Sequence, residues 1–236
     1  MDNATRLQYL QAMGIDVWVS RTSSQPVVYE PLPETKLSTD NIIPEPALIN
    51  TQNNWTALET EVADCTKCSL CKTRTQTIFG TGNKTAEWMI IGEAPGQSED
   101  EQGKPFVGKA GQLLTEMLRA VGLDRDDVFI TNILKCRPPG NRDPKPEEAE
   151  SCGHYLRQQR DLIQPKIILA VGRIAAQTLL NTDAPLAKLR GKVHTLDGVP
   201  LVVVYHPAYL LRSLIEKRKA WQDLQLALKT IKETKG

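Results

Sequence analysis

The chain has 236 residues, of which 40% are hydrophobic and 24% are charged, and its formal net charge is +1. The apolar fraction is sufficient for a folded core and excludes disorder throughout the chain. No apolar run approaches the ~18 residues of a membrane-spanning helix, and the first residues lack the basic and apolar regions of a secretion signal. We therefore expect a cytoplasmic protein that makes no contact with a membrane.

The start of the chain differs in composition from the rest. Residues 1–60 hold three basic and seven acidic side chains, which leaves residues 61–236 with a net charge of +5. Residues 22–54 contain five prolines among polar residues, and this composition is typical of a flexible linker. Residues 1–21 are then either a peptide that docks on a partner protein or a leader that has no partner. Residues 55–236 are expected to form the folded domain.

In the folded domain, short apolar runs alternate with helical patterns. The expected strands are Glu87–Ile91, Val128–Leu134, Lys166–Val171 and Leu201–Tyr205. The expected helices are Ala110–Val121, Pro146–Ile163, Arg173–Leu180 and Lys217–Ile231. Alternation of strands and helices predicts an α/β fold, here a three-layer α/β/α sandwich with a four-stranded, mainly parallel sheet.

Polar residues stand at the ends of three expected strands. Glu93 follows the first strand, Asn132 lies near the end of the second and His206 follows the fourth. Because ligands of parallel sheets bind outside the carboxyl ends of the strands, we expect these three side chains to converge on one site. Taken singly, each has a structural alternative, as a helix cap, a turn residue or a buried histidine. No dinucleotide fingerprint, phosphate-binding loop or nucleophile elbow accompanies them.

The five cysteines predict a metal site. Cys65 and Cys68 form a Cys-x2-Cys pair, whereas Cys136 and Cys152 lie far downstream. Two ligands from a tight turn and two from distant segments would form a closed four-thiolate site. This spacing leaves zinc and an iron–sulfur cluster equally open. Cys71 is then surplus, and the alternative is that all five are free thiols.

Four motifs, in order and at matching spacing, resemble those of family 4 uracil-DNA glycosylases. They are Gly92–Gly96, Gly103–Gly111, Thr131–Pro139 and His206–Arg212, and the resemblance extends from about Cys65 to Trp221. It implies the uracil-DNA glycosylase fold and the excision of uracil from DNA, which leaves an abasic site in an intact backbone. Single-stranded and double-stranded DNA both remain candidate substrates, and we expect a monomer. The resemblance also implies a bacterial or archaeal cell, in which the protein works at the nucleoid.

The resemblance also implies a structural [4Fe–4S] cluster, which favours iron over zinc. By motif position, its ligands are Cys65, Cys68, Cys136 and Cys152. This assignment agrees with Cys71 being the surplus cysteine.

Roles for the pocket residues follow from the same resemblance. Phe106 would stack on the extruded uracil, Asn132 would bond to its edge, and His206 would donate a hydrogen bond to its O2 atom. Ala94 occupies the position where other uracil-glycosylase families place a residue that orients the attacking water. Glu93 and Glu99 are therefore candidates to orient that water, although Glu93 is also placed to exclude the thymine methyl group, and both fit helix-start acids.

DNA contacts are expected from two further segments. A helix start offers backbone N–H groups to a phosphate, and the loop after the last strand offers two leucines as a wedge and one arginine. The residues concerned are Gly108, Lys109, Ala110, Gly111, Leu210, Leu211 and Arg212.

Two other functions compete with the enzyme. A non-hydrolytic relative would trap or bind uracil in DNA, or associate with a polymerase. The covalent relatives carry a histidine-containing loop after the second strand, but the corresponding segment Arg137–Glu150 has no histidine. A small iron–sulfur electron carrier would leave Asn132, Phe106 and His206 without a purpose. Residues 1–21 are the candidate contact with a replication or repair protein.

Overall fold

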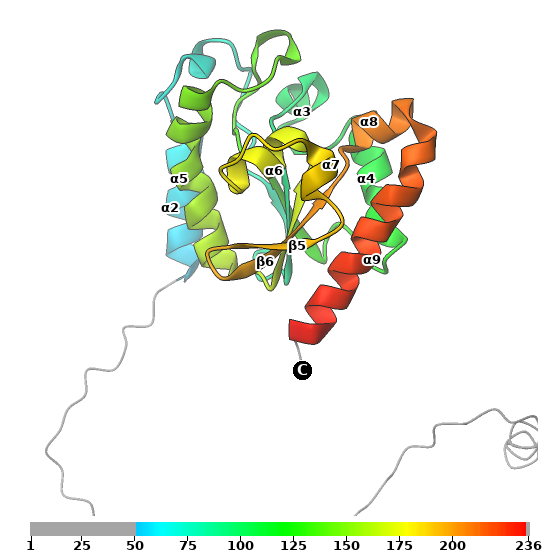
Figure 1. Ribbon diagram of the computed structural model, residues 1–236. Coiled ribbons are helices and arrows are strands. Elements are labelled where there is room, and N and C mark those ends of the chain that lie inside the picture. Colours follow the sequence, from blue (N-terminus) through cyan, green and yellow to red (C-terminus); the bar gives the residue numbers. More distant parts are fainter. Residues whose placement is uncertain (1–50, 235–236) are drawn as a thin grey trace, which may run out of the picture. The chain divides into compact units, whose positions relative to one another are not determined.

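The computed structural model describes residues 51–234 (Figure 1). The expected peptide of residues 1–21 and most of the expected linker lie outside the described residues. Helix α2 spans Thr51–Ala63, so the last four residues of the segment expected to be linker are helical instead. None of the described helices is long and apolar enough to cross a membrane.

Four parallel strands form the centre of a six-stranded sheet with the order β1-β3-β2-β4-β6-β5. The parallel strands are β2 (Trp88–Gly92), β3 (Val128–Asn132), β4 (Ile167–Val171) and β6 (Val199–Val204). At the edges, β1 (Thr81–Gly82) pairs with β3 and β5 (Val193–Leu196) pairs with β6, both antiparallel. The four expected parallel strands are therefore confirmed, but the expected total of four is wrong, because two short edge strands give the sheet six strands within residues 51–234.

Helices cover both faces of this sheet, as the three-layer prediction requires. Their bounds are α3 (Gln97–Gln102), α4 (Lys109–Arg119), α5 (Pro146–Ile163), α6 (Arg173–Leu179), α7 (Leu186–Leu189), α8 (Pro207–Arg212) and α9 (Lys217–Thr234). Three single-turn 3-10 helices accompany them: η1 (Ser69–Lys72), η2 (Pro139–Asn141) and η3 (Leu214–Glu216). Helices α2, α5, α6 and α7 contribute to the core on one face, and α4, α8 and α9 contribute to the core on the other (Figure 1).

Alternating side chains of the central strands supply the two cores. In β2, Met89 and Ile91 belong to one core, whereas Trp88 and Ile90 belong to the other. A strand buried on both faces has no polar face, which explains the continuous apolar runs in the sequence. Because β2, β3, β4 and β6 run in the same direction, the loops that follow them meet at one edge of the sheet, and the site lies there.

Candidate functional site

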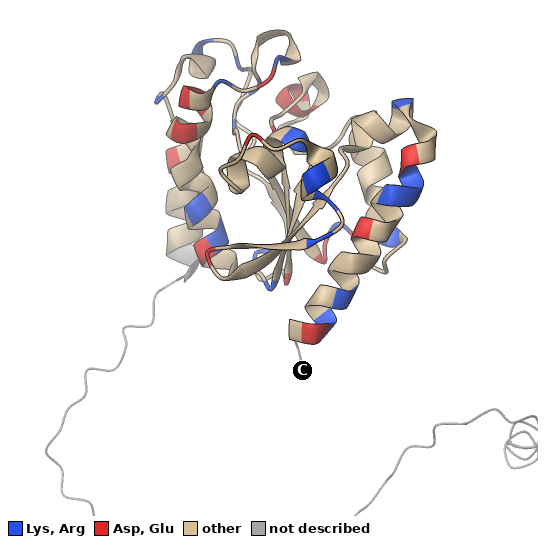
Figure 2. Ribbon diagram, viewed as in Figure 1, with Lys and Arg blue, Asp and Glu red and all other residues tan. Residues whose placement is uncertain are grey.

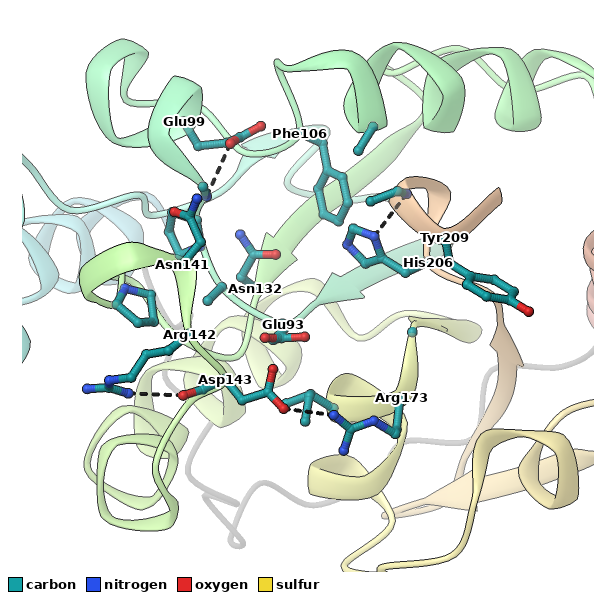
Figure 3. Close-up of a pocket in the computed structure, with 18 of the residues that line it drawn as sticks. Glu93, Glu99, Phe106, Asn132, Asn141, Arg142, Asp143, Arg173, His206 and Tyr209 are labelled. Atoms are coloured by element: carbon teal, nitrogen blue, oxygen red, sulfur yellow. Dashed lines mark hydrogen bonds and ion pairs between the residues drawn. The ribbon is translucent and has the colours of Figure 1, made fainter. Parts of the chain in front are cut away.

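A pocket of about 780 Å³ lies at the carboxyl ends of all four parallel strands. Glu93, Asn132 and His206, which were expected to converge, all line it, and so do Ala94, Glu99 and Phe106. In Figure 3, the side chains of Phe106, Asn132, Glu93 and His206 surround the same space. Residues that received no role from the sequence complete the lining, chiefly Asn141, Arg142, Asp143, Arg173 and Tyr209.

The Asn132 amide lies at the base of this pocket with its acceptor unused. Asn132 is 2% exposed and ends β3, where it is in register with Gly92 of the neighbouring strand. Its Oδ1 atom is buried and has no hydrogen-bond partner within residues 51–234. A β-carbon on residue 92 would lie 2.4 Å from this oxygen, so glycine is required there. An unpaired buried acceptor costs free energy, and a ligand that donates to it recovers that cost.

The Phe106 ring forms an apolar wall beside Asn132. The ring centroid lies 5.8 Å from that of His206, and a β-carbon on Gly92 would lie 2.5 Å from its Cζ atom. The backbone of Phe106 has a φ of 54°, which is rare for a bulky residue and costs on the order of 1 kcal/mol. A β-carbon on Gly111 would lie 1.8 Å from the Phe106 carbonyl oxygen, so that residue is also restricted to glycine.

Glu99 holds the loop that carries Phe106. Its Oε1 accepts hydrogen bonds from the backbone N–H groups of Val107 at 2.9 Å and Gly108 at 3.1 Å. Its Oε2 accepts from Gly96 at 3.1 Å, in a capping box at the start of α3. With three N–H donors on its two oxygens, this carboxylate fits the helix-start role better than that of a group that orients water.

His206 presents a neutral ring to the pocket. It caps α8, and its Nδ1 accepts a hydrogen bond from the N–H of Ala208 at 3.1 Å, which assigns the ring proton to Nε2. Burial, with the positive charge of Arg212 adding to it, lowers the pKa of His206 to about 4, although Glu99 acts in the opposite direction. The ring is therefore uncharged at neutral pH. Gly172, whose φ is 95°, lies against it, and a β-carbon there would be 3.0 Å from the His206 Cβ atom.

Glu93 is a desolvated carboxyl group. Burial, with the negative charge of Asp143 adding to it, raises the pKa of Glu93 to about 7, although Arg173 acts in the opposite direction. Arg173 and Asp143 form an ion pair at 2.7 Å that joins the loop after η2 to the start of α6 (Figure 3). A carboxyl group with a pKa near neutrality can exchange a proton with a ligand at physiological pH.

Some of the residues expected to contact DNA are available to it, whereas others already make contacts within the protein. Ala110 and Arg212 line the pocket, and Lys109 is exposed at the start of α4. Gly108 and Gly111 make contacts within the protein instead. The N–H of Gly108 donates to Glu99, and Gly111 packs against the Phe106 carbonyl.

The two leucines expected as a wedge point to different environments. Leu210 is 1% exposed and packs in the core beneath α8, so its side chain is not available as a wedge. Leu211, on the next position of the helix, is 43% exposed. Beyond them, Leu214 and Ile215 of η3 are 65% and 85% exposed, and the sequence interpretation missed both. The signal for them was an apolar pair followed by Lys217, Arg218 and Lys219.

Four cysteines line a second, small cavity. They are Cys65, Cys68, Cys136 and Cys152, while Cys71 is not part of its lining. The sulfur of Cys136 accepts a hydrogen bond from Arg74 Nη1 at 3.0 Å, and that of Cys152 from the N–H of Lys135 at 3.3 Å. No three Cys, His, Asp or Glu side chains among the described residues are grouped closely enough to hold one metal ion.

Lys135 lines the cysteine cavity and bonds to the backbone of the pocket residue Asn132. Its side chain is 1% exposed, and its ammonium donates to Thr131 Oγ1 at 2.6 Å, Gln159 Oε1 at 2.6 Å and the Asn132 carbonyl at 3.0 Å. All three partners are uncharged. Burial lowers the pKa of Lys135 to about 7, although Cys152 acts in the opposite direction. The charged form is therefore costly unless anions lie nearby, which is the environment that a set of thiolates would supply.

Comparisons with known proteins agree on one family. The sequence model of the "Uracil DNA glycosylase superfamily" matches residues 79–225. The type-4 uracil-DNA glycosylase of Archaeoglobus fulgidus is 49% identical over 159 residues, which cover 64% of this chain and 80% of the relative. The type-4 uracil-DNA glycosylase of Thermotoga maritima is 42% identical over 176 residues, which cover 73% of this chain and 92% of the relative. The DNA polymerase of Bacillus phage SP01 is 35% identical over 135 residues, which cover 57% of this chain but 14% of the polymerase.

Proposed function

This chain belongs to the uracil DNA glycosylase superfamily, and from that membership we propose that it hydrolyses the N-glycosidic bond of deoxyuridine in DNA. A water molecule supplies hydroxyl to C1′ of the sugar and a proton to uracil, so the products are free uracil and an abasic site. The observation that carries the proposal is the orphaned Asn132 Oδ1 between Phe106 and His206. A planar base with an N–H group at its edge fits that arrangement.

Asn132 would distinguish uracil from cytosine. Its Oδ1 accepts from the uracil N3–H, and its Nδ2 donates to O4. Cytosine presents an acceptor at N3 and a donor at N4, so it leaves both groups of a fixed amide mismatched. Phe106 contributes a stacking surface that stabilises the extruded base by about 1–3 kcal/mol, which offsets part of the few kcal/mol needed to unstack and unpair it.

His206 would stabilise the leaving group. Negative charge develops on uracil O2 as the glycosidic bond breaks, and the Nε2–H of a neutral His206 donates to that oxygen. The bond from Ala208 fixes the tautomer before the reaction begins, so no reorganisation is needed at that moment.

Glu93 is the group we propose for orienting the attacking water, because Glu99 already accepts three N–H groups and Ala94 has no polar side chain. Only the carboxylate form accepts a proton from water. The raised pKa of Glu93 then makes excision faster as the pH increases through about 7.

We expect the pH profile of single-turnover excision to move with the charges around Glu93. Asp143→Asn removes a negative charge, lowers the pKa of Glu93 and shifts the rise in rate to lower pH. Arg173→Gln removes a positive charge and shifts the rise to higher pH, whereas Glu93→Gln abolishes it. Rates are measured between about pH 5 and pH 9 with uracil in a single-stranded oligonucleotide. An unchanged profile in all three variants contradicts the assignment of Glu93.

Duplex DNA would meet the apolar tip formed by Leu214 and Ile215. The tip follows α8, which begins at the pocket, and Figure 2 shows several basic residues and an acidic one in this part of the chain. The acidic residue of η3, Glu216, is paired with Lys219 at 2.8 Å. Arg212, Lys217 and Arg218 are exposed and can approach phosphates on either side of the tip. An exposed aliphatic side chain among cations suits the space left in the base stack by an extruded nucleotide, with Leu211 beside it.

We expect Ile215→Ala to slow excision from duplex DNA by about tenfold, because a buried isoleucine side chain contributes about 1.5–3 kcal/mol. Excision from a single strand, where no stack needs filling, stays unchanged. Val193→Ala is the matched control, since Val193 is an exposed aliphatic residue on β5. An equal effect of Ile215→Ala on both substrates would overturn this role.

The four cysteines around the second cavity fit an iron–sulfur cluster better than a single ion. A cluster of several atoms needs thiolates spread around a space, whereas a single ion needs them at one point. The N–H donors on the sulfurs of Cys136 and Cys152 and the buried ammonium of Lys135 suit an anionic group. Cys65 and Cys68 would complete the ligand set, and the cluster would serve as a structural link between the start of the domain and β3.

Anaerobically purified protein is expected to contain about four iron and four sulfide per chain, as a [4Fe–4S] site with four thiolate ligands requires. Cys152→Ser should lose most of both, whereas Cys71→Ser should retain them because Cys71 lies outside the cavity lining. Iron and sulfide are measured chemically, with zinc measured in the same samples. Zinc in place of iron, or equal loss in the two variants, contradicts the assignment.

The activity itself is tested with a labelled oligonucleotide that carries one uracil. Cleavage that appears only after hot alkali identifies an abasic product and a hydrolytic glycosylase. The same oligonucleotide with cytosine or thymine is the control. No cleavage by cluster-loaded protein would favour the second candidate, a uracil-DNA-binding module, which the match to part of a phage DNA polymerase also favours. A heat-stable protein–DNA band would indicate covalent trapping.

Residues 1–21 remain the proposed contact with a replication or repair protein, and residues 22–50 the proposed tether. We propose a monomer that works in the cytoplasm, close to the chromosome.

A further inference from the structure

Phe106 holds an unfavourable backbone conformation that its neighbours must maintain. Its φ of 54° lies in the left-handed region, which side chains with a β-carbon rarely adopt. Such conformations persist where the surrounding structure fixes them. The contacts of the two peptide groups around Phe106 therefore show what fixes the ring in the pocket.

Arg125 makes those contacts on the carbonyl side. It lies between α4 and β3, outside the pocket lining, and its guanidinium donates to the Pro105 carbonyl at 2.9 Å and the Phe106 carbonyl at 3.2 Å. A third hydrogen bond joins it to Thr115 Oγ1 at 3.3 Å. All three acceptors are uncharged. The guanidinium of this partly buried arginine therefore donates two of its hydrogen bonds to the backbone of the Phe106 loop and none of the three to a carboxylate.

Glu99 makes the matching contacts on the amide side, where it accepts from Val107 and Gly108. Arg125 thus holds the carbonyl of the peptide group before Phe106, and Arg125 and Glu99 together hold the peptide group after it, one at the carbonyl and the other at the N–H. The ring end is confined by Gly92 and His206. A φ that relaxed to negative values would rotate the ring out of this space.

From these contacts we infer that Arg125 is a positioning residue for uracil recognition, which acts by holding Phe106 in the conformation that stacks on the base. This inference rests on the proposed function. It predicts that Arg125 contributes to the binding of uracil only as long as residue 106 carries an aromatic ring.

A double-mutant cycle on the full-length, cluster-loaded protein tests this. Free uracil is the probe, and its inhibition constant is measured with a single-stranded substrate. We expect Arg125→Gln to raise the inhibition constant about tenfold in the wild-type background and less than twofold in a Phe106→Leu background, since coupled residues are not additive. Arg125→Lys retains the charge but not the fork of donors, so it should give an intermediate value.

Arg119→Gln is the matched control, because Arg119 is an exposed arginine at the end of α4 that forms ion pairs with Glu116 and Asp124. It should leave the inhibition constant unchanged. Melting temperatures accompany each measurement. If Arg125→Gln fails to fold, Arg125→Lys replaces it in the double-mutant cycle. The inference is supported if Arg125→Lys raises the inhibition constant in the wild-type background but not in the Phe106→Leu background.

Three results would overturn the inference. Equal effects in both backgrounds would mean that Arg125 acts independently of Phe106. Weaker binding of uracil-free DNA, together with a shallower salt dependence, would mean a direct phosphate contact. An unchanged inhibition constant in both Arg125 variants would mean that the loop keeps the conformation of Phe106 without Arg125. An inactive wild-type protein would instead contradict the proposed function.

Discussion

His206→Ala is expected to excise uracil on the order of 10²–10³ times more slowly than the wild type, because removal of one preorganised donor to a developing anion costs about 3–4 kcal/mol. The Nε2–H of His206 has no substitute in alanine, and its orientation is set by the bond between Nδ1 and Ala208. Single-turnover rates at saturating enzyme measure the chemical step. The binding of uracil-containing DNA should change little, since the donor acts mainly on the departing base.

His194→Ala is the control for this prediction. His194 lies on β5, where its Nε2 contacts the Leu189 carbonyl at 2.6 Å, and it is not part of the pocket. A rate within threefold of the wild type in His206→Ala would exclude His206 as the donor to O2.

Stability provides an independent check on His206. Its pKa is about 4 in the folded protein, below the ordinary value of 6.5. The unfolded chain therefore binds a proton at this position before the folded protein does, and the free energy of unfolding falls as the pH falls from about 6.5 toward 4. Denaturant titrations should show a smaller fall in His206→Ala. An equal pH dependence in the two proteins would contradict a neutral, buried ring.

Asn132→Ala is the second change with a large expected effect. It removes an acceptor and a donor from the uracil edge, so we expect excision to slow by roughly 10²–10³-fold through two lost hydrogen bonds of about 1.5–2 kcal/mol each. The ratio of uracil to cytosine excision should fall as well, because the amide that cytosine mismatches is gone. Both rates are measured on oligonucleotides that differ in that one base.

Asn141→Ala serves as the comparison, because Asn141 also lines the pocket but its Oδ1 accepts from Arg137 Nε at 2.8 Å. Its effect should be less than threefold. If Asn132→Ala retained both its rate and its selectivity, the edge of the base would have to be recognised by other groups.

The central sheet was predictable because burial on both faces leaves a continuous apolar run for each strand. Helix α5 was predicted with its observed bounds, since Pro146 and Glu148 mark its first turn and Glu148 closes a capping box. The convergence of Glu93, Asn132 and His206 followed from strand direction alone, before any family was considered. The edge strands were missed because β1 has two residues and β5 is half exposed, so neither has an apolar run.

The division of labour within the site was not predictable from sequence. Glu93 and Glu99 stand six residues apart near one motif, yet only the structure separates a desolvated acid from one that caps backbone amides. Leu210 and Leu211 are adjacent leucines of α8, yet the first is buried and the second is exposed. Arg125 lies outside the four motifs, and nothing in its neighbours along the chain indicates that it reaches the loop around Phe106.

Three glycines pack directly against pocket residues, and we expect a single missense mutation at any of them to inactivate the enzyme. Asn132 is opposed by Gly92, Phe106 by Gly111 and His206 by Gly172, and any replacement of these glycines adds at least a β-carbon in contact with one of the three residues. With these three glycines, the mutational target of the site is about twice as large as the set of three residues that we propose to contact the base. A protein that removes uracil from DNA protects its own coding sequence from cytosine deamination, and these glycine codons are among those in which an unrepaired change would disable that protection.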